Sequence, residues 1–285
     1  MNFTDHVKLT EAKAKKSLRL IKALSGTNWG QQKELLCNTY KQYVRPTMEY
    51  ACPAWAPATS KTNIEKLQRV QNAALRCCTG HTRDWNANYY HQETKVLPMQ
   101  VHLNMLSSQY REGVRDPEHP LHDELRAPAP ERDMKATALH SPHLTLVHGC
   151  DREGECEKER RTNKQVIHTE TVRSYLEQRD VHPLLQMQAP DVDKSEATLP
   201  RASRRTLAQL RARKGPLLRT YLCNIGAADD PGCPLCGHDC HDVAHLFECQ
   251  HIQIHLTPLD LWRNPVRAAA LVDEWGAALA LVEDA

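Results

Sequence analysis

Three cysteines and one histidine near the C-terminal end have the types and spacing of metal ligands. Cys233 and Cys236 are separated by two residues, and Gly237 follows them in a tight turn. His245 and Cys249 lie four positions apart, which places both on one face of a helical turn. The pattern Cys-x2-Cys-x8-His-x3-Cys predicts a structural zinc site, because three thiolates and one imidazole complete the tetrahedral set that zinc prefers. A complete set leaves no position for a catalytic water, so hydrolytic zinc is not expected.

The assignment of these four ligands has competitors within the same segment. Cys240 lies between the two pairs and could replace one of the cysteines. Neighbouring imidazoles could do the same; they are His238, His241, His251 and His255. A redox-active Cys-x-x-Cys or a set of buried thiols is the alternative to any metal. Because large apolar residues are scarce here, bound zinc is expected to contribute folding energy.

A strongly basic stretch precedes the cysteines. Between 197 and 228 the sequence has seven basic residues and no acidic one, and beyond 228 ten acidic residues outnumber two arginines. Arginine favours phosphate because its planar guanidinium donates two parallel hydrogen bonds. The residues expected to contact phosphate groups are Arg204, Arg205, Arg211, Arg213 and Lys214. The alternatives are a solvated amphipathic helix and an intramolecular partner for the acidic tail.

The elements that must position these residues are predicted to be helices, so we expect a mainly α fold. Apolar residues recur at helical spacing over 10–26, 31–44 and 62–80, and again after Pro98 and over 162–178. Pro46 is expected to end the second helix, because it pushes the residue before it out of helical geometry. Thr62 and Glu65 have the spacing of a capping box at the start of the third.

Composition shifts divide the chain into three expected parts. Residues 1–112 are predicted to form a helical bundle. Residues 113–196 are interrupted by prolines and predict a linker or insertion that contains one helix. Residues 197–285 hold the basic helices, the zinc module and an acidic helical tail.

Composition also bears on location. No apolar run is long enough to span a membrane, and the N-terminus lacks the features of a secretory signal. Eleven cysteines without a signal indicate metal ligands and free thiols in a reducing compartment. We therefore expect an intracellular protein, in the cytoplasm or the nucleus, without a membrane partner.

Several segments in a fixed order resemble one known family. They are Gly26-Thr-Asn-Trp-Gly30, Val44-Arg45-Pro46, Glu49-Tyr-Ala-Cys-Pro-Ala-Trp55, Lys66-Leu-Gln-Arg-Val-Gln-Asn-Ala-Ala-Leu-Arg76, Tyr221-Leu222 and Leu261-Trp-Arg-Asn-Pro265. Together with the zinc motif, this order resembles the part that follows the catalytic palm in reverse transcriptases of non-LTR (LINE-like) retrotransposons. The resemblance covers the larger part of the chain, but the middle, about 113–197, shows little of it.

The resemblance implies a helical thumb over 1–112 that clasps a template–primer duplex of RNA and DNA. Lys66, Arg69 and Arg76 would then contact phosphates, although a solvated basic helix face is the alternative reading. Intact relatives hold magnesium on palm aspartates, and this chain has no such palm; Asp229-Asp230 lies in a Gly/Pro-rich segment and is interpreted as a turn. The chain is therefore expected to hold nucleic acid without polymerising, with an upstream polymerase portion as a partner.

A second hypothesis belongs to a different class of function. The chain could be a zinc-bearing protein–protein interaction module that binds no nucleic acid. The acidic tail and the aliphatic segment from Leu259 to Leu281 would then supply the contact surface. A degenerate relic without activity is a third reading.

Overall fold

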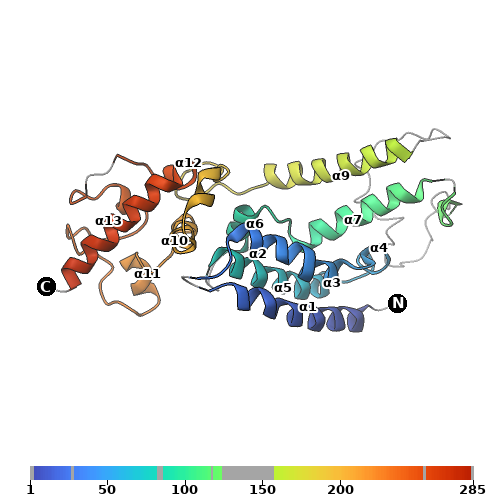
Figure 1. Ribbon diagram of the computed structural model, residues 1–285, viewed down its shortest axis with the longest axis horizontal. Helices are drawn as coiled ribbons and strands as arrows, with labels where there is room; N and C mark the ends of the chain where they lie inside the picture. Colours follow the sequence, from blue (N-terminus) through green and yellow to red (C-terminus); the bar gives the residue numbers. More distant parts are fainter. Residues whose placement is uncertain are drawn as a thin grey trace. The chain divides into compact units, whose positions relative to one another are not determined.

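A computed structural model describes residues 3–26, 29–81, 86–116, 118–123, 157–252 and 255–283, which are mainly helical and contain no strands. The principal helices are α1 (Thr4–Leu24), α2 (Lys33–Thr39), α3 (Arg45–Glu49), α4 (Cys52–Trp55), α5 (Lys61–Thr79), α6 (Ala87–Thr94), α7 (Met99–Val114), α9 (Glu157–Glu177), α10 (Arg201–Arg211), α11 (Arg219–Asn224), α12 (Asp260–Arg263) and α13 (Pro265–Glu283) (Figure 1). A π-helix, η1, covers Tyr40–Val44, and short 3-10 turns cover Lys194–Thr198 (η3) and His245–Phe247 (η4). None of the described helices is both apolar and long enough to cross a membrane.

The chain forms two units, each assembled from separated segments. Unit 1 contains residues 1–22, 37–74 and 96–179, and unit 2 contains residues 23–36, 75–95 and 180–285. These borders do not coincide with the three parts expected from composition. The reason is that segments from the N-terminal third, 23–36 and 75–95, pack with the C-terminal residues through buried ion pairs described below.

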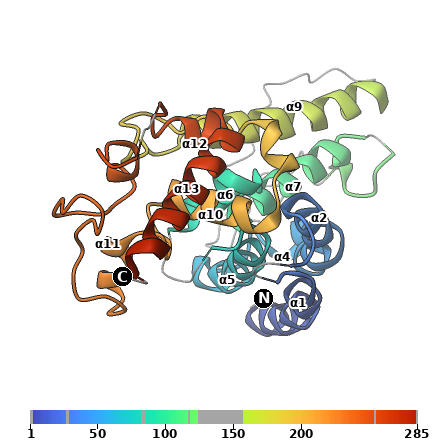
Figure 2. The same cartoon turned by 60° about the vertical axis from the view of Figure 1, so that its left-hand side comes forward.

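In unit 1, α1 and α5 run side by side (Figure 1 and Figure 2). One stripe of α1 is buried, namely Val7, Thr10, Ala14, Leu18 and Ile21. The corresponding stripe of α5 includes Ile64, Leu67, Val70 and Ala74. The Asn63 side chain donates a hydrogen bond of 3.1 Å to the Thr4 hydroxyl and so joins the two helices near their first turns.

The helix expected to end before Pro46 continues past it. The Arg45 amide donates to the Tyr40 carbonyl, five residues earlier, which is the hydrogen bond of a π turn. Pro46 then falls in the first turn of α3, where its missing amide is tolerated. The prediction of a helix end at this proline was therefore wrong, because the π turn lets the chain continue into α3 without needing an amide hydrogen at Pro46.

The start of α5 also differs from the prediction. The Asn63 and Ile64 amides both bond to the Ser60 carbonyl, so the helix begins at Lys61 and Thr62 already lies in its first turn. The predicted capping box was therefore wrong by about two positions. Further along α5, the Gln68 side chain accepts from the Met99 amide at 2.6 Å and so satisfies one of the free amides at the N-terminus of α7.

Unit 2 has one apolar core that α10, α12, α13 and the cysteine-rich loop share. Its buried members include Leu207, Leu210, Leu261, Trp262 and Trp275. The aliphatic C-terminal segment contributes one face to this core: Leu271 and Trp275 are buried, whereas Val266 and Leu281 are exposed.

Candidate metal centre and basic surfaces

The structure brings the four predicted metal ligands together. The sulfur atoms of Cys233, Cys236 and Cys249 and a ring nitrogen of His245 all lie within 4.8 Å of one another. Cys236 Sγ is 3.3 Å from His245 Nε2. Cys233, His245 and Cys249 are buried, and Cys236 is half-buried. This cluster could hold a metal ion.

Two short turns present the ligands. The Gly237 amide donates to the Cys233 carbonyl at 2.9 Å, and Gly237 adopts a φ of 72°, in the left-handed region that favours glycine. On the other side, the Cys249 amide donates to the His245 carbonyl at 3.0 Å. The Asp242 carboxylate accepts from the His245 amide at 3.0 Å and fixes the start of that turn.

Helix α13 anchors the loop that carries the cluster. The Trp275 indole donates a buried hydrogen bond of 3.1 Å to the Leu246 carbonyl, between the last two ligands. Trp275 is fully buried, and Leu246 and Phe247 pack in the same core. The ligand loop is thus part of the core of unit 2, although the sequence pattern suggested a small separate module.

The donor set fits a zinc-sized ion. A tetrahedral zinc with bonds of about 2.3 Å to sulfur places its ligand atoms about 3.8 Å apart. Separations of up to 4.8 Å therefore need only small side-chain movements to close. A backbone hydrogen bond at His238 lowers the pKa of the Cys236 thiol, whereas burial raises that of Cys249 to about 11. Because zinc binds the thiolate, metal binding would displace the proton that Cys249 otherwise keeps, and affinity should rise with pH.

The competing ligands lie outside the cluster of four. The His238 ring stacks on the His245 ring at 4.6 Å between centroids and contacts the Cys240 carbonyl. His241 is fully buried, and its Nδ1 accepts from the Arg219 amide at 3.2 Å.

The Asp229-Asp230 pair lies in a turn, as predicted, because the Asp230 carboxylate accepts from the Gly232 amide at 2.9 Å.

Two arginines that were expected to contact phosphate are instead buried in ion pairs. Arg211 pairs with Glu93 at 2.9 Å and with Glu196 at 2.7 Å, and it donates two further bonds to the Leu261 carbonyl. Arg204 is 5% exposed and pairs with Glu34. Their guanidinium groups face protein carboxylates, so the expectation that Arg204 and Arg211 bind nucleic acid was wrong. The carboxylates that pair with these two arginines belong to Glu34, Glu93 and Glu196, which lie outside the acidic tail.

Lys33 completes this buried cluster, which we call the ion network (Lys33, Glu93, Glu196 and Arg211). Lys33 Nζ lies 2.6 Å from Glu93 and 2.8 Å from Glu196. Burial alone would raise the pKa of Glu93, but Arg211 and Lys33 outweigh burial and lower it well below its usual range. The sequence carries no periodic signal for this network, because its members lie far apart in the chain.

The other predicted phosphate contacts are more accessible. Arg213 and Arg69 are exposed, and the half-buried residues are Lys66, Arg76, Arg205 and Lys214. Some of these make local bonds: Lys66 donates to the Asn63 side chain at 2.8 Å, and Arg205 donates to the Gly80 carbonyl at 3.3 Å. The eight residues are divided between the two units, so they do not form one surface within either unit.

Helix α1 carries a basic surface that the sequence reasoning missed. Lys13, Lys16 and Arg19 are exposed on the side away from the buried stripe, and we call them the α1 basic face. Lys8 and Lys15 pair with Asp5 and Glu11, but no described residue forms an ion pair with the α1 basic face. The signal was present as basic residues three positions apart, opposite the apolar positions.

Searches of protein-family models, curated proteins and solved structures found no match to this chain. Its own geometry therefore carries the functional argument.

Proposed function

We propose that this protein holds a nucleic-acid duplex, in the manner of the thumb and zinc-bearing part of a non-LTR retrotransposon reverse transcriptase. The observation that carries the proposal is the α1 basic face. Without palm aspartates, the chain itself binds nucleic acid and does not polymerise nucleotides. The duplex of RNA and DNA at a primer end is the partner that the sequence resemblance suggests.

The arrangement of α1 supports contacts to a phosphate backbone. Arg19 lies six positions after Lys13, so the three side chains are spaced over about 9 Å of helix at 1.5 Å per residue. A row of unpaired cations on a rigid helix contacts phosphates without reading bases, which suits a polymerase that must accept any template. Arg69, also exposed and on the neighbouring α5, extends the same kind of surface in unit 1.

A salt titration tests the proposal. Binding of a labelled RNA–DNA hybrid would be measured by fluorescence anisotropy across salt concentrations for the wild type and for the triple variant Lys13→Gln, Lys16→Gln, Arg19→Gln. If each side chain neutralises one duplex phosphate, the slope of log affinity against log salt falls by up to about 2.7.

The matched control removes three exposed arginines elsewhere, namely Arg173, Arg263 and Arg267, each changed to Gln. Its net charge equals that of the triple variant. The proposal requires the control to keep most of the wild-type slope. If both variants lose the same amount of slope, the effect is due to net charge alone and the proposal fails. If the wild type does not bind the hybrid even at low salt, a protein partner is favoured instead.

We further propose that the metal cluster holds zinc in a structural role. The closed set of three sulfurs and one nitrogen in the core of unit 2 supports this assignment. The test is the metal content of purified protein by mass spectrometry, with Cys249→Ser against Cys240→Ser as the matched control. One zinc per chain is expected in the wild type and the control, and much less in Cys249→Ser. Equal loss in both variants would show that Cys240 is a ligand.

A further inference from the structure

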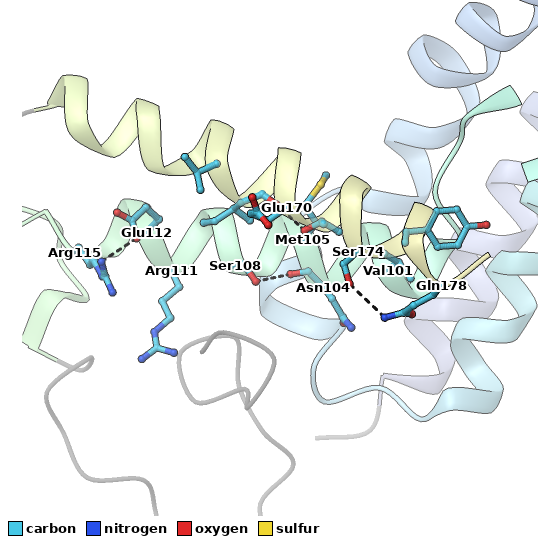
Figure 3. A pocket seen from close by; sticks show the side chains of 14 residues that line it. Val101, Asn104, Met105, Ser108, Arg111, Glu112, Arg115, Glu170, Ser174 and Gln178 are labelled. Atoms are coloured by element: carbon cyan, nitrogen blue, oxygen red, sulfur yellow. Dashed lines mark hydrogen bonds and ion pairs between the residues drawn. The ribbon is translucent and has the colours of Figure 1, made fainter. Parts of the chain in front are cut away.

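The antiparallel helices α7 and α9 of unit 1 line a partly open cavity of about 470 Å³ (Figure 3). Three contacts fix one end of the pair: Gln109 donates to the Lys164 carbonyl at 3.0 Å, Asn163 donates to Glu112 at 2.8 Å, and Arg160 pairs with Asp116. The volume lies within the range of about 300–1,000 Å³ that is typical of sites for small molecules. Sites between helices are a common place for such ligands.

The cavity has an apolar floor with neutral polar groups around it. Met105 and Ile167 are buried at the floor, Val101 and Tyr175 extend it along the two helices, and the exposed Val166 lines the rim. The polar lining is Asn104, Ser108, Thr171, Ser174 and Gln178. On each helix the lining residues recur at intervals of three and four, so the cavity follows the helix axes for several turns. An elongated apolar group fits this shape.

The charges of the lining leave one cation without a partner. Glu112 pairs with Arg115 at 3.2 Å, and Glu170 pairs with Arg173, which is not a lining residue. Arg111 has no hydrogen-bond or ion-pair partner among the residues that the structure describes. In Figure 3 its guanidinium stands clear of the other labelled side chains. Burial and then the neighbouring Arg115 lower the pKa of Arg111, and the attraction of Glu112 offsets this only in part, so a bound anion would further stabilise the charged guanidinium.

We propose that this cavity binds a single-chain carboxylate amphiphile, such as a long-chain fatty acid. The carboxylate lies against Arg111, because a planar guanidinium pairs with two carboxylate oxygens at once. The alkyl chain lies along Met105 and Ile167 and covers apolar surface that water otherwise contacts. One unpaired cation favours a single negative charge over a doubly charged phosphate. This site is independent of the proposed nucleic-acid binding.

The test is binding of the fluorescent carboxylate 11-(dansylamino)undecanoate to the full chain, followed by displacement with oleate below its micelle concentration. Oleyl alcohol serves as a ligand with the same chain and no charge. Arg111→Gln should weaken oleate about 10-fold or more, as loss of a charge-assisted hydrogen bond implies, and should leave oleyl alcohol within about twofold. Ser108→Phe should reduce binding of both by filling the cavity.

Arg263→Gln, an exposed arginine in unit 2, is the matched control and should bind oleate as the wild type does. Hydrogen exchange should show oleate protecting 101–115 and 166–178. The proposal is overturned if Arg111→Gln and the control weaken oleate binding equally. It is also overturned if oleate protects amides outside 101–115 and 166–178 instead. The proposal also fails if oleate does not bind while an acidic amphipathic peptide protects these helices, since the groove would then receive a protein helix.

Discussion

Replacing Arg211 by Met separates a structural role from a nucleic-acid role. Met keeps much of the aliphatic volume but removes the charge and all five donors. In the variant, Glu93 and Glu196 stay buried with Lys33 as their remaining partner in the ion network. We expect a loss of stability with no change in the salt slope of nucleic-acid binding.

The magnitude follows from the contacts. Removal of one partner from a buried ion pair costs about 3–5 kcal/mol, because the opposite charge is left uncompensated. The Leu261 carbonyl also loses its two donated bonds, which are 2.9 Å and 2.7 Å long in the wild type. These losses overlap, so we expect the free energy of unfolding to fall by about 4 kcal/mol in total. This is a large fraction of the about 5–15 kcal/mol by which folded proteins are usually stable.

Urea denaturation followed by tryptophan fluorescence measures this loss, since Trp262 and Trp275 are buried in unit 2. With a slope of about 2 kcal/mol per molar urea, the midpoint of the unit 2 transition should fall by about 2 M. Exposed Arg213→Met, two positions away, is the control and should change stability by less than about 0.5 kcal/mol.

The effect should also depend on pH. The pKa of Glu93 is lowered from 4.5 in the folded wild type, so its ion pairs stabilise the fold above about pH 4.5. That stability is lost as the pH falls towards the folded pKa, and the difference between variant and wild type should shrink there. An Arg211→Met protein as stable as the control at pH 7 would refute the assigned role of the ion network.

Three further outcomes follow from single positions. Burial lowers the pKa of His81 to about 3, so unit 2 should lose stability as pH falls from 6.5 towards 3, by at most about 1.4 kcal/mol per pH unit. The variant His81→Phe should flatten this part of the profile of stability against pH, measured by urea denaturation. Gly237→Ala should cost about 1–2 kcal/mol and weaken metal retention against a chelator, because its φ is 72°. Gly276→Ala in α13, where an added Cβ meets nothing within 4 Å, should instead raise the thermal midpoint, by about 0.5–1 kcal/mol of stability.

Local spacing determined much of this protein. Apolar residues three and four positions apart predicted α1, α5 and α7, because a buried helix face needs that period. The two ligand pairs of the metal cluster were also readable, since Cys233 with Cys236 and His245 with Cys249 each lie within one turn. Helix ends were less predictable, as Pro46 shows, because a π turn depends on the surrounding packing.

Only the tertiary structure decided which basic side chains are free. Arg211 and Arg213 are two positions apart in an equally basic stretch, yet one is buried between Glu93 and Glu196 and the other is exposed. Sequence proximity could not separate them, because the partners of Arg211 lie on distant segments that meet only in the folded unit 2. The pairing of α7 with α9, and with it the cavity, has the same origin. Local periodicity specifies which face of a helix is buried, but burial partners and residual charge depend on contacts between segments far apart in the chain.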